Sequence, residues 1–245
     1  FQQHSFKTAA AVKKSGYNIK YITTVYDKKG SLTHFGLSLL KGNNRTRAER
    51  RKTADLSDNE VVLKCELLEL LLLILQRVDK KEYWYSKIYQ LLLKRFSKSV
   101  FKYINKEKIN IIILYDIVSA DLIHEIKKHG LQTKIILDMS APYYNYMESQ
   151  FRRDMKVNSE NRIETEKLLE NPLQAYKRKY SAYEIKEADA FLVASDYTRR
   201  SLVDSGIDNH RIFTCRYGID DFSCNDITNT NTSSNRAILK VMYAG

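Results

Sequence analysis

Short apolar runs rich in β-branched residues recur along the chain and predict buried strands. They occupy residues 19–26, 109–115, 133–138, 190–194 and 211–216. Helix-like stretches lie between several of these runs and end at Gly16, Gly130 and Gly206, where glycine can adopt the left-handed conformation that closes a helix. Strands that alternate with helices indicate βαβ units. The predicted fold class is therefore α/β, with a Rossmann-like parallel sheet and helices on both faces.

A helical insertion at about residues 41–106 interrupts this alternation. Its first part, residues 41–60, is charged and loop-like. The apolar stretch at residues 61–75 contains three charged side chains and is shorter than the about 20 apolar residues of a membrane span, so we expect a buried helix there. A second helix is expected from about residue 83 to residue 106, with Leu91 on its apolar face.

Four lysines of the second helix form one basic stripe. Spaced seven, four and four residues apart, they are Lys87, Lys94, Lys98 and Lys102. One interpretation is an ordinary solvated helix surface, because basic helix faces are common. The other interpretation is contact with an anionic membrane surface. The sequence pattern leaves both open.

The last third of the chain contains a second charged insertion and a change in composition. The insertion, at residues 152–170, precedes Asn171-Pro172, a favourable helix start because Asn caps well and Pro fits the first helical position. Residues 223–236 are rich in Asn, Thr and Ser and indicate a linker. We therefore expect one domain at residues 1–222, followed by this linker and by the first strand of a truncated further domain at residues 237–245.

Composition narrows the class of protein. With 43% hydrophobic residues among 245, a disordered chain is excluded. Lysine and arginine outnumber the acids by 41 to 29, and the formal charge of +12 indicates an anionic partner. The charge is dispersed and no RNA- or DNA-recognition signature is present, so no nucleic acid is expected.

Absent motifs exclude several further classes of protein. The three cysteines form no CxxC pair, so neither a disulfide framework nor a zinc site is indicated. No signal-peptide pattern is present, and the default location is cytoplasmic. The sequence also lacks GxGxxG, GxxxxGK[ST], GxSxG and HExxH, the patterns of dinucleotide, triphosphate, serine-hydrolase and zinc-protease sites. No metal site is expected.

Candidate binding residues follow from the predicted topology, because ligands of an open parallel sheet bind outside the carboxyl ends of its strands. The candidates are the Gln2-Gln3-His4 loop, Asp27-Lys28, Asp116, the segment Asp138-Met139-Ser140-Ala141-Pro142-Tyr143-Tyr144, Ser195-Asp196-Tyr197 and Tyr217-Gly218. A lone histidine such as His4 is weak evidence for catalysis.

Several of these candidates have a plain structural alternative. Ser195, which precedes helix-forming residues, is most simply a helix cap. Asp138 either orders its loop or contacts a substrate. The tyrosines at positions 143, 144 and 146 either pack in the interior or form a platform on which a sugar ring stacks. None of these residues decides the function alone.

One segment of forty residues favours a particular protein family. Residues 183–222 read YEIKEADAFLVASDYTRRSLVDSGIDNHRIFTCRYGIDDF. This segment resembles the end of the N-terminal domain of GT-B glycosyltransferases of the family 4 type, the group 1 glycosyl transferases. The matching residues are Glu184 or Glu187, Ala188-Asp189, Ser195, Leu202, Gly206-Ile207, Arg211-Ile212, Tyr217-Gly218-Ile219-Asp220 and Phe222. More weakly, residues 2–23 are similar to the first loop, first helix and second strand of such domains, and residues 239–245 to the strand that opens their donor domain.

The resemblance implies transfer of a hexose from a nucleotide diphosphate sugar, usually with retention of configuration, to a glycan or lipid-linked glycan, as in polysaccharide biosynthesis. No metal or cofactor is implied beyond the nucleotide sugar as co-substrate. This chain would be the acceptor-side domain. If the basic stripe contacts a membrane, the expected location is cytoplasmic and peripheral at the inner face of that membrane. The paired glutamates and the diphosphate site of the family lie in the donor domain, so we expect the fragment alone to be inactive.

The predicted carboxyl edge of the sheet gives candidate roles to particular residues. Asp138 is the candidate at the reacting centre, as a general base or as a group that orients the acceptor hydroxyl. The candidate substrate contacts are Gln3, His4, Ser140, Tyr143, Tyr144, Ser195, Tyr217 and Gly218. The alternative from another class is a non-catalytic GT-B-like or basic module that docks on a membrane or on nucleic acid.

Overall fold

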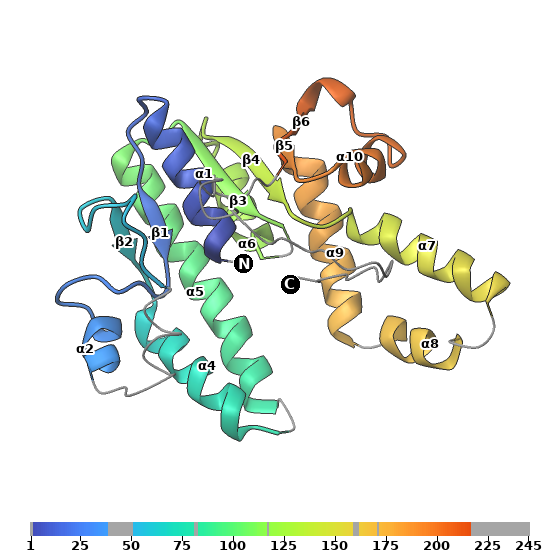
Figure 1. Cartoon of the computed structure of the whole chain (residues 1–245), viewed down its shortest axis with the longest axis horizontal. Helices are drawn as coiled ribbons and strands as arrows, with labels where there is room; N and C mark the ends of the chain where they lie inside the picture. Colours follow the sequence, from blue (N-terminus) through green and yellow to red (C-terminus); the bar gives the residue numbers. More distant parts are fainter. Residues whose placement is uncertain are drawn as a thin grey trace, which may run out of the picture.

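A parallel sheet of four strands forms the centre of the molecule (Figure 1). The structure, a computed structural model, describes residues 2–38, 51–80, 83–116, 118–158, 162–170 and 172–216. The strands run in the order β3 (Ile111–Tyr115), β4 (Lys134–Met139), β5 (Ala190–Val193) and β6 (Ile212–Thr214). These positions agree with four of the predicted apolar runs, and the α/β class with a parallel sheet is confirmed.

Two further strands form a separate parallel pair. β1 (Tyr21–Thr23) pairs with β2 (Val61–Leu63), and Ile22 lies opposite Val62. No hydrogen-bonded ladder joins this pair to β3 within the described part of the chain. Among the described residues, the strands thus form two parallel sheets, whereas the sequence predicts one.

One face of the four-stranded sheet carries the main core. Because side chains alternate along a strand, Ile135, Leu137 and Met139 of β4 point to the same side, and all three are fully buried. They pack in one cluster with residues of α5 (Tyr83–Glu107), α6 (Ala120–Lys128), α9 (Pro172–Glu187) and α10 (Asp196–Val203). Asp138 points to the opposite face.

Helix α1 (Gln2–Lys14) lies against that opposite face, where the Thr8 hydroxyl donates to the Asp138 carboxylate over 3.3 Å. The helix begins at Gln2, so the prediction of a loop at residues 2–4 is wrong. Phe6 of α1 joins Tyr26, Leu56 and Val61 in a second, smaller core next to β1 and β2.

The helical insertion differs from its prediction. The stretch at residues 61–75 is not one helix, because its β-branched start pairs with β1 as β2. Cys65 then adopts a left-handed conformation with φ 57°, and α4 (Glu66–Val78) begins after it. Nor is α4 fully buried, since one row of its aliphatic side chains faces solvent. The second helix, α5, has the predicted bounds to within one residue.

The remaining elements in the described ranges are helical. They are α2 (Leu32–Ser38), α7 (Tyr144–Val157), α8 (Arg162–Glu170) and the 3-10 turn η1 (Asn209–Arg211). α9 begins at Pro172, as predicted, while Asn171 lies outside the described residues. Gly16, Gly130 and Gly206 have φ values of 86°, 65° and 86°, which confirms the predicted left-handed helix ends. The expected linker and final strand, residues 223–245, also lie outside the described residues.

Candidate functional site

The carboxyl ends of β3 and β4 bring several polar side chains together. Tyr115 and Asp138 are register partners on these neighbouring strands, on the face that α1 covers. Asp116 follows Tyr115 directly, and its carboxyl group interacts electrostatically with Asp138. We refer to six residues here as the carboxyl-edge cluster: Ser5, Thr8, Tyr21, Tyr115, Asp116 and Asp138.

Helix α1 supplies the hydroxyl groups that tie this cluster together. The Ser5 hydroxyl lies 2.6 Å from the Tyr21 phenol oxygen. Both Ser5 and Thr8 hydrogen-bond the Tyr115 phenol, and Thr8 also donates to Asp138. Asp138 is only 5% exposed, so its carboxylate is positioned by these contacts and is not a free surface group.

Burial tunes the protonation of the tyrosines. Loss of water raises the pKa of Tyr115 well above its ordinary value, and the charge of Asp138 raises it further. Burial likewise raises the pKa of Tyr21. Both phenols therefore stay protonated at neutral pH, and each has a proton to donate in a hydrogen bond.

Asp116 is an acidic group of this cluster whose pKa is raised toward neutral pH. Burial raises its pKa to about 6, against a lowering by its own backbone N–H, and the neighbouring charge of Asp138 adds to the rise. A carboxyl group with this pKa can exchange protons near neutrality, the property that general acid–base catalysis requires. The sequence placed Asp116 at the carboxyl edge, but its perturbed pKa depends on burial that the sequence does not show.

The segment after β4 packs inward. Tyr143 and Tyr144 are both buried, and Ser140 is partly exposed. The Tyr143 backbone N–H donates to the Ser201 hydroxyl over 2.9 Å, and the Tyr143 phenol accepts from the Asn145 amide. These contacts favour the packing interpretation of the two tyrosines over that of an open stacking platform.

Ser195 caps a helix, as its simplest interpretation predicted. Its hydroxyl accepts the Thr198 backbone N–H over 3.1 Å at the start of α10. Of the other predicted contacts, Gln3 and His4 belong to the first turn of α1, directly before Ser5, and their side chains lie outside the described part.

Tyr217 and Gly218 also lie outside the described residues. The structure therefore brings Asp138 together with Thr8 of α1, the helix that begins with Gln2, Gln3 and His4. It places Tyr143 and Ser195 in structural contacts of their own.

The segment that carries the family resemblance contains two structural carboxylates. Glu184 is fully buried in α9, and its Oε1 accepts the Ser119 backbone N–H over 2.7 Å. Asp189 accepts the Ile135 backbone N–H over 2.8 Å and so joins the starts of β4 and β5. Burial alone would raise the pKa of Asp189, but this hydrogen bond and nearby lysines lower it below its ordinary value.

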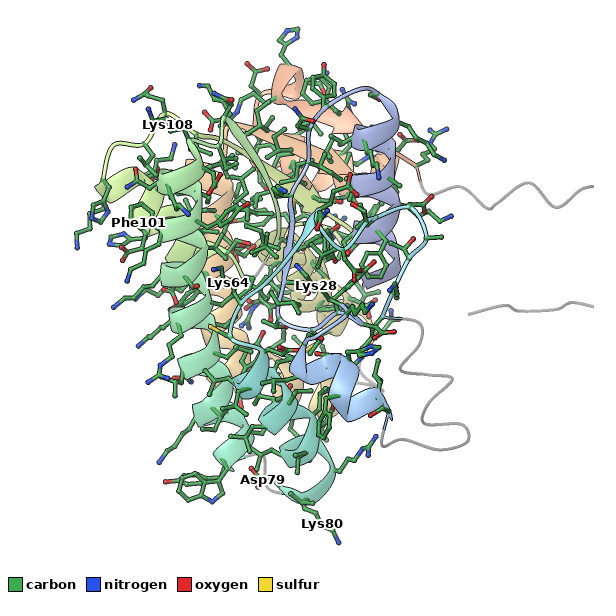
Figure 2. The ribbon with its side chains drawn as sticks, turned by 90° about the vertical axis from the view of Figure 1, so that its left-hand side faces the viewer. Lys28, Lys64, Asp79, Lys80, Phe101 and Lys108 are labelled. Carbon is green, nitrogen blue, oxygen red and sulfur yellow. The ribbon has the colours of Figure 1, made fainter. Side chains whose placement is uncertain are left out.

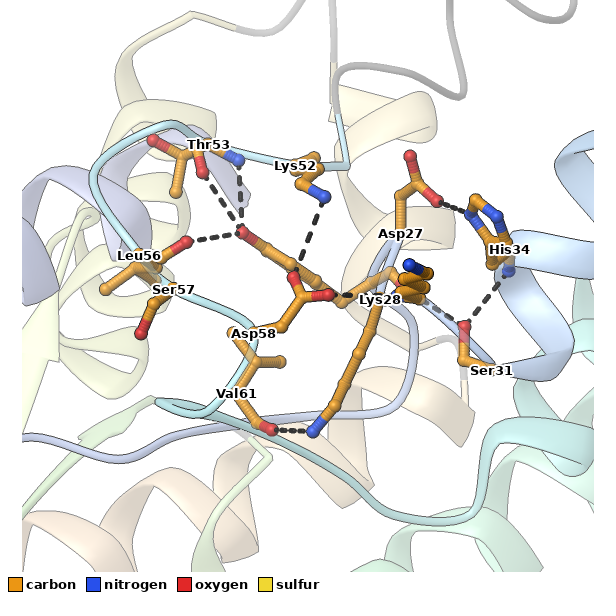
Figure 3. Close-up of polar contacts among 12 residues, drawn as sticks. Asp27, Lys28, Ser31, His34, Lys52, Thr53, Leu56, Ser57, Asp58 and Val61 are labelled. Atoms are coloured by element: carbon orange, nitrogen blue, oxygen red, sulfur yellow. Dashed lines mark hydrogen bonds and ion pairs between the residues drawn. The ribbon is translucent and has the colours of Figure 1, made fainter.

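A second polar cluster follows β1 (Figure 3). The buried Tyr26 phenol donates to the Thr53 carbonyl oxygen over 3.2 Å, and the Lys28 ammonium group donates to the Val61 carbonyl oxygen over 2.8 Å. His34 Nδ1 lies 2.6 Å from Asp27 Oδ1. The sequence singled out Asp27-Lys28 but not His34, because the contact depends on the position of α2.

Among the described residues, no group of three or more His, Cys, Asp or Glu side chains is placed to hold a metal ion. No helix in that part of the chain is both long and apolar enough to cross a membrane. No protein-family model, curated protein or solved structure matches this chain.

Proposed function

We propose that this chain is the acceptor-side domain of a nucleotide-sugar glycosyltransferase of the hexosyltransferase type. The observation that carries the proposal is the correspondence between the family-like segment and the fold. Residues 183–216 form the end of α9, then β5, α10 and β6 of a parallel sheet. Asp189, Ser195 and Gly206 occupy the turning points between these elements.

The carboxyl-edge cluster is where we place the acceptor. A retaining reaction needs no strong base on the acceptor side, so the proposed role of Asp138 is to accept a hydrogen bond from the acceptor hydroxyl and orient it. Asp116, with a pKa of about 6, is the group suited to exchange the proton that this hydroxyl loses. The nucleotide sugar is the proposed co-substrate, and a glycan or lipid-linked glycan is the proposed acceptor.

Saccharide binding tests this proposal without a nucleotide sugar. Saturation-transfer NMR would be recorded on the chain with a panel of glycans and short-chain lipid-linked saccharides. For a saccharide that binds, Asp138→Asn is expected to weaken binding about tenfold or more, because it removes a charged hydrogen-bond acceptor.

The matched control is Asp154→Asn, which changes an exposed carboxylate of α7 and should leave binding unchanged. Equal binding by the two variants would remove Asp138 from the site. The absence of binding to every saccharide of the panel would contradict the proposed function.

A further inference from the structure

Helices α4 and α5 form a hairpin that extends away from the sheets (Figure 1). The end of α4 lies at one extremity of the molecule: Figure 2 places Asp79 and Lys80 there, and Lys108, which follows α5, toward the other extremity. We refer to six described residues at the end of α4 and the start of α5 as the hairpin tip: Ile74, Val78, Lys80, Tyr83, Trp84 and Lys87.

One face of α4 exposes a row of aliphatic side chains that the sequence predicts to be buried. Spaced four, three and four residues apart, with the exposed fraction of each, they are Leu67 69%, Leu71 39%, Ile74 59% and Val78 66%. Single exposed apolar residues are common on protein surfaces, but a continuous row on one helix face marks an interaction surface.

The start of α5 adds two aromatic side chains next to this row. Tyr83 and Trp84 are 55% and 59% exposed. The Lys87 ammonium group lies 4.1 Å from the centre of the Tyr83 ring and 5.6 Å from that of Trp84. Exposed tryptophan and tyrosine beside lysine are typical of the boundary between lipid headgroups and acyl chains, because each combines an apolar body with a polar end.

The net charge of the hairpin indicates which kind of partner surface it complements. The two helices carry seven basic and three acidic side chains, a net charge of +4. Two acidic groups near the row bind backbone: Asp79 accepts the Tyr85 N–H over 2.9 Å, and Glu66 accepts the Thr33 N–H over 2.5 Å. The exposed groups are therefore mainly aliphatic, aromatic and cationic, which complements an anionic lipid surface.

We propose that the hairpin tip docks the chain on an anionic membrane surface. Ile74, Val78 and Trp84 enter the boundary between headgroups and acyl chains, while Lys80 and Lys87 contact lipid phosphates. The docking goes beyond the proposed sugar transfer and does not depend on it. Of the basic stripe on α5, it assigns only Lys87 to the membrane, because Lys94, Lys98 and Lys102 lie about two to four turns farther along the helix.

Trp84 is the only tryptophan of the chain, so its fluorescence reports directly on the hairpin tip. On addition of vesicles of phosphatidylcholine and phosphatidylglycerol, its emission is expected to shift to shorter wavelength and to become protected from acrylamide. The chain should float with these vesicles in a density gradient. Vesicles of phosphatidylcholine alone should bind it more weakly.

Paired variants separate the apolar contribution from general surface effects. Ile74→Ser with Val78→Ser is expected to lower the vesicle partition coefficient about tenfold or more. The control, Ile163→Ser with Val157→Ser, removes the same two residue types at 68% and 78% exposure on α8 and α7 and should leave partitioning unchanged. All four side chains are exposed, so the fold should survive, which far-UV circular dichroism checks.

A second pair tests the charges. Lys80→Glu with Lys87→Glu should weaken binding to the anionic vesicles at low salt, where screening is weak. Lys14→Glu with Lys128→Glu, on exposed residues at the ends of α1 and α6, should have a smaller effect.

The proposal is overturned if the Trp84 emission does not change with anionic vesicles, or if the Ile74/Val78 pair and its control behave alike. It is also overturned if sedimentation shows that the Ile74/Val78 pair abolishes self-association while vesicles fail to bind. The saccharide experiment contains no vesicles, so failure of sugar binding and failure of membrane docking are separate results.

Discussion

The backbone N–H of Ser119, where α6 begins, donates to Oε1 of Glu184 in α9 over 2.7 Å. The Ser119 hydroxyl donates to the carbonyl oxygen of Tyr115, the last residue of β3. The Glu184 carboxylate of α9 therefore accepts the N–H at the start of α6, a group that has no partner within its own helix. Together with the Ser119 hydroxyl, it fixes the position of Ser119 relative to the end of β3. The Glu184 carboxylate of the family-like segment therefore has a structural partner.

Removal of this carboxylate should destabilise the fold. Glu184→Ala leaves the Ser119 N–H buried without its acceptor, and we expect a loss of about 2–4 kcal/mol in the free energy of unfolding. Urea denaturation measures this loss. Glu170→Ala, at an exposed position in α8, is the control and should change stability by less than about 0.5 kcal/mol. Similar losses in the two variants would mean that the contact contributes little.

Local signals predicted much of the fold. The β-branched runs correspond to β1, β3, β4, β5 and β6, and the left-handed glycines correspond to helix ends. The strand β2 was missed because its three residues merge with the leucine-rich helix that follows, and only pairing with Tyr21–Thr23 distinguishes them. Such pairing is a tertiary contact, which a local pattern does not contain.

The candidate site was predictable only in part. The rule for carboxyl ends of strands selected Asp138 and Asp116 without knowledge of their neighbours. The partner of Asp138, Thr8, is 130 residues away in the sequence. The inward packing of Tyr143 likewise depends on Ser201 of α10. Composition and spacing do not reveal these contacts.

The protonation of Asp116 predicts a pH dependence of stability. Because its folded pKa of about 6 lies above the ordinary 3.8, the folded chain keeps a proton that the unfolded chain loses first. The stability from this protonated group is full below the ordinary pKa and is lost as the pH rises through the folded pKa. Asp116→Asn stays neutral, so relative to wild type it should gain about 1–3 kcal/mol between pH 4 and pH 8.

Unfolding by urea at several pH values measures this difference, with Asp154→Asn as the exposed control. The same pH dependence in wild type and Asp116→Asn would show that burial does not perturb this carboxyl.

The cap at Ser195 gives a prediction that separates its two interpretations. Ser195→Ala removes the acceptor of the Thr198 N–H and should cost about 1 kcal/mol of stability, whereas Ser195→Asp, also a good cap, should retain most of it. If Ser195 acts only as a cap, saccharide binding will be unchanged in both variants once they are folded. Weakened binding in the stable Ser195→Asp variant would instead assign Ser195 a ligand contact.

Tyr26 gives the last prediction, because its phenol joins two segments that lie apart in the sequence. The ring is fully buried, and its hydroxyl donates to the Thr53 carbonyl oxygen and accepts the Thr53 N–H over 3.3 Å. Tyr26→Phe keeps the ring but leaves both Thr53 groups without this partner, so we expect a loss of about 1–2 kcal/mol.

The loss of stability should be local as well as global. The Tyr26 hydroxyl bonds the segment that leads into β2, and the Tyr26 ring packs in the small core beside that segment. Hydrogen exchange should therefore quicken at the Thr53 amide before it changes in β4. Tyr17→Phe, on an exposed phenol, is the matched control and should alter neither rate. Unchanged exchange at Thr53 in the Tyr26→Phe chain would show that apolar packing, and not the phenol, holds this segment against β1.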